Sequence, residues 1–302
     1  MVETRAQALR PPSAVMMTSQ VRQFLEQVSA RSPVGMAVAR RVSRTVRRWW
    51  RHQRTSGYVL SYPGSGRTWL TVLIGKALID QHRLEGMNPA AITDLADLRR
   101  GVPRIEVRHD DSPQLRRPDE VERDKSRYAR KSVVLLVRDP RDAIISYFFE
   151  ASKRRGRFEG SAGQFLRHPV GGLDTLITYY NVWAEHREVP RRFCLVRYED
   201  LHREPVDQLG RVMSAFGQSP SHAILEGAVE FSRFENMRKM EAKGFARPEL
   251  DRRDPADVES FKTRKGKVGG YREYLSPEDV DYLNARIAER LSPYYADYLT
   301  PK

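Results

Sequence analysis

A glycine-rich segment between an apolar run and a helical pattern constrains the fold of this chain most strongly. The apolar run at residues 58–62 predicts a short buried strand, and residues 68–81 place their apolar side chains on one side of a helix. The joining sequence, YPGSGRTW at residues 62–69, lets the backbone approach an anion closely, because two of its residues are glycines. Amides at a helix start point toward such an anion. The segment therefore predicts a phosphate-binding loop, and an ordinary glycine-rich turn is the alternative.

The side chains of this segment add hydrogen-bond donors, but its sequence differs from the Walker A loop, the best-known phosphate-binding loop. Ser65, Arg67 and Thr68 all carry donors. A Walker A loop needs the pattern G-x-x-x-x-G-K-[ST]. Here Ser61 stands at its first glycine and Arg67 at its lysine. A P-loop nucleotide-dependent kinase therefore remains an alternative that lacks two of its key residues.

The rest of the chain alternates strand and helix patterns. Residues 132–137 are a continuous β-branched and leucine run of the kind buried in a parallel sheet. Shorter strands are expected at 105–107 and 193–197, and Pro140 fits the first turn of a helix. This alternation predicts an α/β fold with a P-loop-like parallel β-sheet flanked by helices on both faces. Helices are expected at residues 140–148, 173–188, 203–217, 220–228 and 277–290, and a long charged loop at 244–270.

The first 54 residues are predicted to be a basic N-terminal extension, partly helical, to a domain over residues 55–302. Valines recur every four residues from Val34 to Val46, and eight arginines with no acidic residue lie between Arg31 and Arg54. This is a basic amphipathic pattern. Residues 31–54 would lie on an anionic membrane surface or hold an acidic acceptor. The alternative is a helix packed on the domain with its arginines in solvent.

The net charge and the single cysteine set the expected partners and compartment. A formal charge of +14 favours anionic partners such as nucleotides and sulfated groups. Cys194 has no partner for an internal disulfide and lies in an apolar run, which indicates a core residue. No apolar stretch approaches the length of about 18 residues that a membrane span needs, and no secretory signal is seen. We expect a cytoplasmic protein, with peripheral membrane attachment through residues 31–54 as an option.

A second candidate anion site follows the strand at 132–137. Arg138 stands at the end of that strand, where open α/β sheets place their ligands, and a guanidinium there can hold a phosphate bidentately. Ser146 lies eight residues further on, near the second turn of the helix that begins at Pro140. A salt bridge that caps this helix is the alternative reading of Arg138.

With these two segments in this order, the chain resembles the superfamily of sulfotransferases that use 3′-phosphoadenosine 5′-phosphosulfate (PAPS). The family's loop has the form Tyr-Pro-Lys-Ser-Gly-x-Thr-Trp, which YPGSGRTW matches except at the lysine. The resemblance implies that the loop holds the 5′-phosphosulfate, that a tryptophan stacks near the adenine, and that an arginine and a serine hold the 3′-phosphate. The expected phosphosulfate contacts are Ser65, Gly66, Arg67 and Thr68. Trp69 is the expected adenine contact, and Arg138 and Ser146 are the expected 3′-phosphate contacts.

Three further segments match the family. RKGKVGGY at residues 264–271 resembles its C-terminal Arg-Lys-Gly-x-x-Gly-x-Trp-Lys stretch, with tyrosine in place of tryptophan and arginine in place of the final lysine. The resemblance implies that Arg264, Lys265 and Gly266 bind the 3′-phosphate. It also implies that Tyr198, directly after a strand, and Ser232 line the adenine pocket. The resemblance spans roughly residues 57–274, nearly the whole predicted domain.

His109 is the expected general base. It follows the strand at 105–107, and the family's histidine base stands at this point in the order of motifs. Histidine suits proton abstraction near neutral pH. Gly64 stands where the family has a lysine that stabilises the leaving phosphate, so another cation must supply that charge. Our candidate is Arg67, acting by electrostatics and not as an acid, and Arg108 is a second option.

The combined motifs imply a sulfotransferase. We expect direct in-line transfer from PAPS to an acceptor hydroxyl or amine, which leaves adenosine 3′,5′-bisphosphate (PAP). No cluster of histidine, cysteine or carboxylate residues has metal-ligand spacing, so no metal is expected. The expected acceptor is a small molecule, a carbohydrate or a glycolipid and not a nucleic acid, and arginine-rich loops such as 152–172 favour a polar or acidic one. The alternatives are the kinase, a PAPS-binding relative with weak activity, and a basic binding protein without catalysis.

Overall fold

The computed structural model of the chain describes residues 51–242 and 266–300. The part from Thr55 onward belongs to one compact unit. Residues 1–50 of the expected N-terminal extension lie outside the described residues. The extension over 1–54 and its boundary therefore stay predictions. Arg264, Lys265 and most of the long loop expected at 244–270 also lie outside the described residues.

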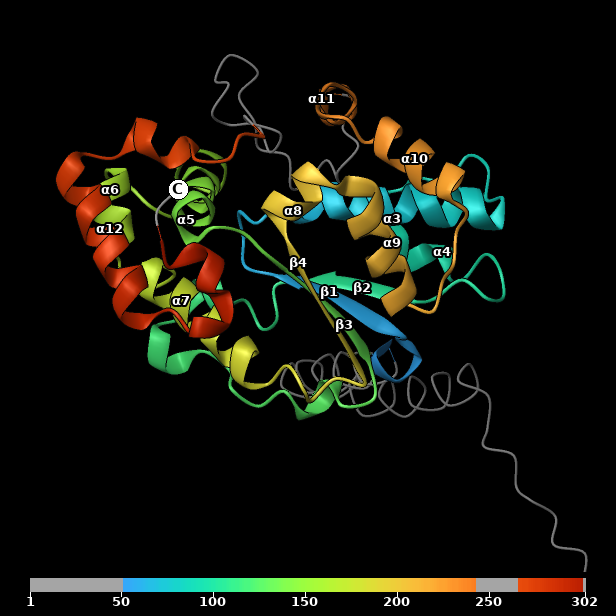
Figure 1. Ribbon diagram of the computed structural model, residues 1–302, viewed down its shortest axis with the longest axis horizontal. Helices are drawn as coiled ribbons and strands as arrows, with labels where there is room; N and C mark the ends of the chain where they lie inside the picture. Colours follow the sequence, from blue (N-terminus) through green and yellow to red (C-terminus); the bar gives the residue numbers. More distant parts are fainter. Residues whose placement is uncertain (1–50, 243–265, 301–302) are drawn as a thin grey trace, which may run out of the picture. The chain divides into compact units, whose positions relative to one another are not determined.

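Four parallel strands form the sheet, in the order β2-β1-β3-β4. Leu60 of the central strand β1 pairs with Arg108 of β2 on one side and with Leu135 of β3 on the other. Every residue of β1 and β3 is buried, because helices cover both faces of the sheet. The expected α/β fold with a parallel sheet and flanking helices is confirmed (Figure 1). The strands are β1 (Gly57–Ser61), β2 (Ile105–Arg108), β3 (Ser132–Val137) and β4 (Arg192–Arg197).

Alternate residues of β3 build two separate apolar cores. Val133, Leu135 and Val137 point to one face, and Val134 and Leu136 point to the other. The first face packs against α5 (Pro140–Phe149), α6 (Ala162–Leu166), α7 (Leu173–Glu185) and α12 (Pro277–Arg290). The second packs against α3 (Arg67–His82), α4 (Ile92–Leu95), α9 (Pro205–Ala215) and α10 (His222–Phe231).

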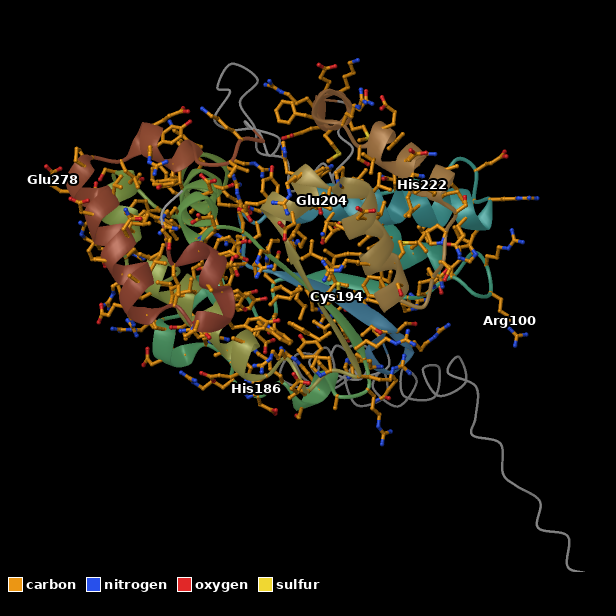
Figure 2. All side chains as sticks on the ribbon, in the orientation of Figure 1. Arg100, His186, Cys194, Glu204, His222 and Glu278 are labelled. Carbon is orange, nitrogen blue, oxygen red and sulfur yellow. The ribbon has the colours of Figure 1, made fainter. Side chains whose placement is uncertain are left out.

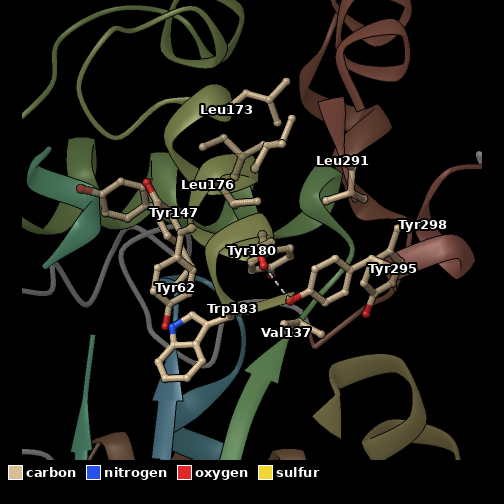
Figure 3. Close-up of a cluster of buried hydrophobic side chains, with 14 of the residues drawn as sticks. Tyr62, Val137, Tyr147, Leu173, Leu176, Tyr180, Trp183, Leu291, Tyr295 and Tyr298 are labelled. Atoms are coloured by element: carbon tan, nitrogen blue, oxygen red, sulfur yellow. Dashed lines mark hydrogen bonds between the residues drawn. The ribbon is translucent and has the colours of Figure 1, made fainter. Parts of the chain in front are cut away.

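Tyrosines give the first core an internal hydrogen-bond framework. The Tyr295 hydroxyl donates to the Tyr180 carbonyl at 2.9 Å (Figure 3). The Tyr180 hydroxyl in turn lies 2.9 Å from both the amide and the carbonyl of Arg138. The backbone at the end of β3 is therefore fixed from within the core, which matters because Arg138 is a candidate ligand-binding residue.

Most expected elements are present, with differences at their ends and among the short helices. The helix expected at 203–217 is α9, which begins at Pro205, and a separate short helix that was not expected, α8 (Tyr198–Arg203), precedes it. Cys194 on β4 is buried in the second core (Figure 2), and its burial raises the pKa of the thiol, consistent with a core residue. Elements that were not expected are α4, α6, α11 (Phe234–Ala242), the π-helical turn η4 (Glu150–Arg154) and the 3₁₀ turns η1 (Pro113–Leu115), η2 (Pro118–Glu120), η3 (Ser126–Tyr128), η7 (Gly270–Tyr274) and η8 (Pro293–Tyr298).

No helix in residues 51–242 and 266–300 is long and apolar enough to cross a bilayer.

Candidate active site

The carboxyl ends of all four strands open onto one cavity of about 750 Å³. The segments that directly follow the strands contribute Gly64 after β1, His109 after β2, Arg138 after β3 and Tyr198 after β4. Parallel strands bring these segments to one edge of the sheet, where α/β proteins bind ligands. The cavity therefore unites residues that are separated by more than a hundred positions in the chain.

The glycine-rich loop forms the floor of this cavity at the start of α3. Gly64 and Gly66 have φ angles of +84° and +88°, which favour glycine, and Gly66 is the N-cap of α3. A β-carbon on Gly66 would lie 2.5 Å from the ring of Tyr198, so glycine is what lets that ring cover the loop. Thr68 and Trp69 line the cavity, whereas Ser65 is buried behind the loop, and its hydroxyl lies beside that of Tyr180.

Arg67 brings a positive charge to the loop. Its side chain lines the cavity from the first turn of α3. Burial lowers the pKa of Arg67 to about 10, and the nearby carboxylate of Glu150 opposes that shift. The guanidinium is therefore still charged at neutral pH, inside a partly desolvated site where its field is strong.

Arg138 links three separate segments of the site. Its guanidinium donates to the Gly64 carbonyl at 3.2 Å and to the Lys267 carbonyl at 2.9 Å. It lies 3.5 Å from the carboxylate of Asp142 and 4.5 Å from the ring centre of Tyr198. Its Nε is buried and has no hydrogen-bond partner among the described residues, as expected of a group that awaits an anionic ligand.

The C-terminal segment is held over α5 by Asp142. The carboxylate accepts hydrogen bonds from the amides of Gly269 at 2.7 Å and Tyr271 at 3.1 Å. Gly266 and Lys267 line the cavity as a result. The expected 3′-phosphate ligand Gly266 thus lies in the same cavity as Arg138, whereas Arg264 and Lys265 fall outside the described residues.

Aromatic and apolar side chains form a slot at the same end of the cavity. The rings of Trp69 and Tyr198 meet edge to face with their centres 5.8 Å apart. Burial raises the pKa of the Tyr198 hydroxyl, so this ring is neutral at physiological pH. Ser232, at the C-cap of α10, is fully buried, and its hydroxyl has no hydrogen-bond partner among the described residues. Val229 and Met237 complete this wall.

His109 lies in the cavity with its tautomer fixed by the backbone. Its Nδ1 is 2.8 Å from the carbonyl oxygen of Ser61. A carbonyl only accepts hydrogen bonds, so Nδ1 carries the proton and Nε2 is the basic nitrogen. His202 also lines the cavity, 6.1 Å from Trp69 between ring centres, on the side of the aromatic slot. His109 is the histidine that lies between the glycine-rich loop and η1.

A buried charge cluster anchors the backbone directly after His109, and the sequence alone did not reveal it. Asp110 is fully buried and lies 2.9 Å from the ammonium of Lys125, which is fully buried too. Asp110 also accepts hydrogen bonds from the Tyr128 hydroxyl at 2.5 Å and the Trp183 indole at 3.1 Å, and it pairs with Arg127. The only signal in the sequence is an aspartate next to the candidate base, because the partners come from distant segments.

Gly64 leaves no room for the family's lysine. A β-carbon there would lie 2.3 Å from the Ala143 carbonyl oxygen and 3.1 Å from the β-carbon of Ser146 on α5. The helix that carries Ser146 therefore packs directly on the loop. Arg108, our second option for the missing charge, pairs with Glu106 and lies over the ring of Tyr58. It does not line the cavity, whereas Arg67 does.

The described residues also contain no group of three or more histidine, cysteine or carboxylate side chains placed to hold a metal ion. The cavity is instead cationic and lined by amides, which suits a polyanionic ligand.

Comparison with known proteins identifies the family. The sulfotransferase domain model matches residues 54–294. The chain belongs to the sulfotransferase family. The resemblance to PAPS-dependent sulfotransferases is therefore confirmed, and the kinase alternative loses its basis.

Individual relatives agree with this assignment at low identity. Flavonol 3-sulfotransferase of Flaveria bidentis is 22% identical over 263 residues, with 78% of this chain and 81% of that protein covered. Cytosolic sulfotransferase 16 of Arabidopsis thaliana is 26% identical over 262 residues, with 78% and 76% covered.

Two solved structures share the fold of this sulfotransferase. A mouse sulfotransferase complexed with PAP superposes with a TM-score of 0.54 at 18% identity, covering 78% of this chain and 84% of that one. Retinol dehydratase in a complex with retinol and PAP gives a TM-score of 0.57 at 18% identity, covering 78% and 81%.

Proposed function

We propose that this chain transfers the sulfuryl group of PAPS to an acceptor hydroxyl or amine. The observation that carries the proposal is that His109, the glycine-rich loop and Arg138 line one cavity at the carboxyl edge of the sheet. A base, an anion-binding helix start and a phosphate-binding arginine are what direct sulfuryl transfer requires.

The described residues fit PAPS by their chemistry. The amides of residues 65–68 and the side chain of Arg67 would hold the 5′-phosphosulfate at the start of α3. Arg138, with an unused buried Nε, and Ser146 would hold the 3′-phosphate. Gly266 would contribute its backbone amide to the same phosphate, together with Arg264 and Lys265. Trp69, Tyr198 and Ser232 would form the adenine slot.

PAPS supplies an activated sulfuryl group, and His109 supplies the base. Nε2 of His109 takes the proton of the acceptor while the acceptor oxygen or nitrogen attacks sulfur. The bond from sulfur to the bridging phosphate oxygen breaks, and PAP leaves with that bond's electron pair. Arg67 stabilises the negative charge that builds on the leaving phosphate, and the products are a sulfate ester or a sulfamate and PAP. His109 gives its proton to solvent afterwards.

The names of the relatives support a class of acceptor and a location for this chain. One relative is named for flavonols and others are named cytosolic, which supports a small-molecule acceptor and a cytoplasmic location for this chain. A carbohydrate or glycolipid acceptor and attachment to an anionic membrane through residues 31–54 stay open predictions.

Calorimetric binding of PAP tests the nucleotide site first. AMP and ATP serve as comparison ligands, without Mg²⁺. We expect PAP to bind more tightly than AMP, and Arg138→Ala to remove that preference, since a bidentate phosphate contact is lost. Equal affinity for PAP and AMP, or a preference for ATP that requires Mg²⁺, would refute the proposal.

A PAPS-binding relative with weak transfer activity is the second candidate, and Gly64 is the observation that favours it. Transfer of label from PAPS to a panel of phenols, amines and sugars separates the two. Tight PAP binding without turnover on any acceptor would favour this second candidate.

A further inference from the structure

The cavity extends well past the expected nucleotide contacts. Its second end lies between η1, after β2, and the π-helical turn η4, which continues α5. The Tyr147 hydroxyl donates to the Gln114 carbonyl at 3.2 Å and so joins these two walls. Leu115 and Phe149 add apolar surface there. His109 lines the same cavity, and the residues of this end are not those expected to contact the nucleotide, so we take this end as the place where an acceptor would enter.

Three arginines give this end a concentrated positive charge. Arg154, Arg155 and Arg157 all line the cavity. Arg154 is only 4% exposed and forms part of the wall of this end. Glu150 is the one acidic residue that lines this end among the described residues, and it lies 3.7 Å from Arg155. Among the described residues, Glu150 set against Arg155 and Arg157 leaves an excess of one positive charge at this end.

The backbone keeps these arginines together. η4 is a π-helical turn, a local widening that often marks functional sites. The Arg155 amide donates to the Glu150 carbonyl at 3.0 Å, and the Arg157 amide donates to the Ala151 carbonyl at 2.8 Å. Backbone hydrogen bonds therefore tie Arg155 and Arg157 back to the first residues of η4.

The nucleotide does not account for this charge. The 3′-phosphate is assigned to Arg138, which directly follows β3, and Ser146, in the middle of α5, and both contact the glycine-rich loop. Arg154 lies eight residues beyond Ser146, about 12 Å further along at the rise per residue of an α-helix. The 5′-phosphosulfate is assigned to the start of α3. The charge at η4 is thus available to a second ligand.

We propose that the acceptor carries an anionic group, a carboxylate in the first instance, that binds Arg155 and Arg157 while its hydroxyl faces His109. Arg154 adds its field from the buried wall of the same end. Apolar contacts with Leu115 and Phe149 would hold the body of the acceptor between these points. The inference rests on the proposed function, because it assumes that PAPS fills the other end of the cavity.

Binding of a matched acid and ester to the PAP-loaded full-length chain tests the proposal. para-Hydroxyphenylacetate and its methyl ester differ at one end only, where the ester has a methyl group and no charge. By calorimetry we expect the acid to bind at least about tenfold more tightly, the effect of one charge-assisted hydrogen bond. Arg157→Gln, at an exposed position, should reduce that preference severalfold, because only Arg155 is left to bind the carboxylate, and should leave the affinity for PAP unchanged. Arg130→Gln is the matched control, because Arg130 is exposed and does not line the cavity.

The outcomes separate this inference from the proposed function. If PAP binds but the acid binds no more tightly than the ester, or neither binds, the anionic acceptor is refuted and the sulfotransferase proposal stands. A preference for the acid that is undiminished in Arg157→Gln would also refute it. If PAP itself fails to bind, the proposed function fails and this inference fails with it.

Discussion

Gly64 packs so tightly on α5 that a β-carbon at this position would lie 2.3 Å from the carbonyl oxygen of Ala143. Its φ of +84° adds a second reason for glycine, because other residues are strained in that region. The packing and backbone conformation of this loop therefore exclude a lysine at position 64. The difference from the family involves the backbone of the loop as well as one side chain.

Restoring the lysine should harm this protein. We expect Gly64→Lys and Gly64→Ala to lower the free energy of unfolding by about 2 kcal/mol or more and to weaken PAP binding, because the loop must move away from α5. Thermal unfolding and calorimetry measure both effects.

Gly86→Ala is the matched control for this prediction. Gly86 has a φ of +73° but nothing within 4 Å of a β-carbon, so it reports backbone strain without a collision. A Gly64→Lys protein that is as stable as the wild type and turns over faster would contradict the packing argument.

His109 should be required for turnover but not for nucleotide binding. Replacement by alanine removes the base, and we expect kcat to fall by about 10²–10⁴-fold, the usual contribution of a positioned general base. PAP affinity should not change, because the expected PAP contacts are other residues. Initial rates with labelled PAPS and calorimetry check the two halves.

His222→Ala serves as the control histidine, since His222 is exposed on α10 and does not line the cavity. Full activity in His109→Ala would rule out this histidine as the base and direct attention to His202.

Asp110 should position His109 and also hold the fold together. Asp110→Asn leaves the fully buried ammonium of Lys125 without its counter-charge, so we expect a loss of about 3 kcal/mol in the free energy of unfolding. Because Asp110, Asp111 and Ser112 all have positive φ, release of this anchor should also displace His109 and lower kcat more than it changes KM for the acceptor.

Asp111→Asn is the neighbouring control for Asp110. The Asp111 carboxylate is 27% exposed and pairs with Arg127 at 2.9 Å, so its loss should cost less than about 1 kcal/mol. Equal effects of the two substitutions on stability and on kcat would argue against a special role for Asp110.

The sequence predicted the elements that carry strong local signals. β3 and α12 have the expected bounds, because one is an unbroken apolar run and the other begins with Ser276 and Pro277, a cap and a first-turn proline. α6 was missed although Ser161 and Gln164 form a capping box, because five residues are too short for a periodic pattern.

The site was predictable in its motifs and not in its contacts. The glycine-rich loop, Arg138 and His109 each follow a strand, so local pattern and parallel topology together bring them to one cavity. The bonds from Asp142 to the amides of Gly269 and Tyr271 join residues more than 120 positions apart. Such pairs depend on tertiary packing, which a single sequence does not encode in any local pattern.

Arg67 should act through its charge. Burial lowers its pKa only to about 10, so the guanidinium remains a cation at neutral pH, next to the expected position of the leaving phosphate. We expect Arg67→Ala to lower kcat by about 10²-fold, as for other groups that stabilise developing negative charge, and Arg67→Lys to retain most of the rate because the charge is kept. Arg108→Ala is the matched control, since Arg108 pairs with Glu106 outside the cavity lining and should leave kcat unchanged. If Arg108→Ala lowered kcat and Arg67→Ala did not, the compensating charge would belong to β2, and the loop would have to change conformation to bring Arg108 to the cavity.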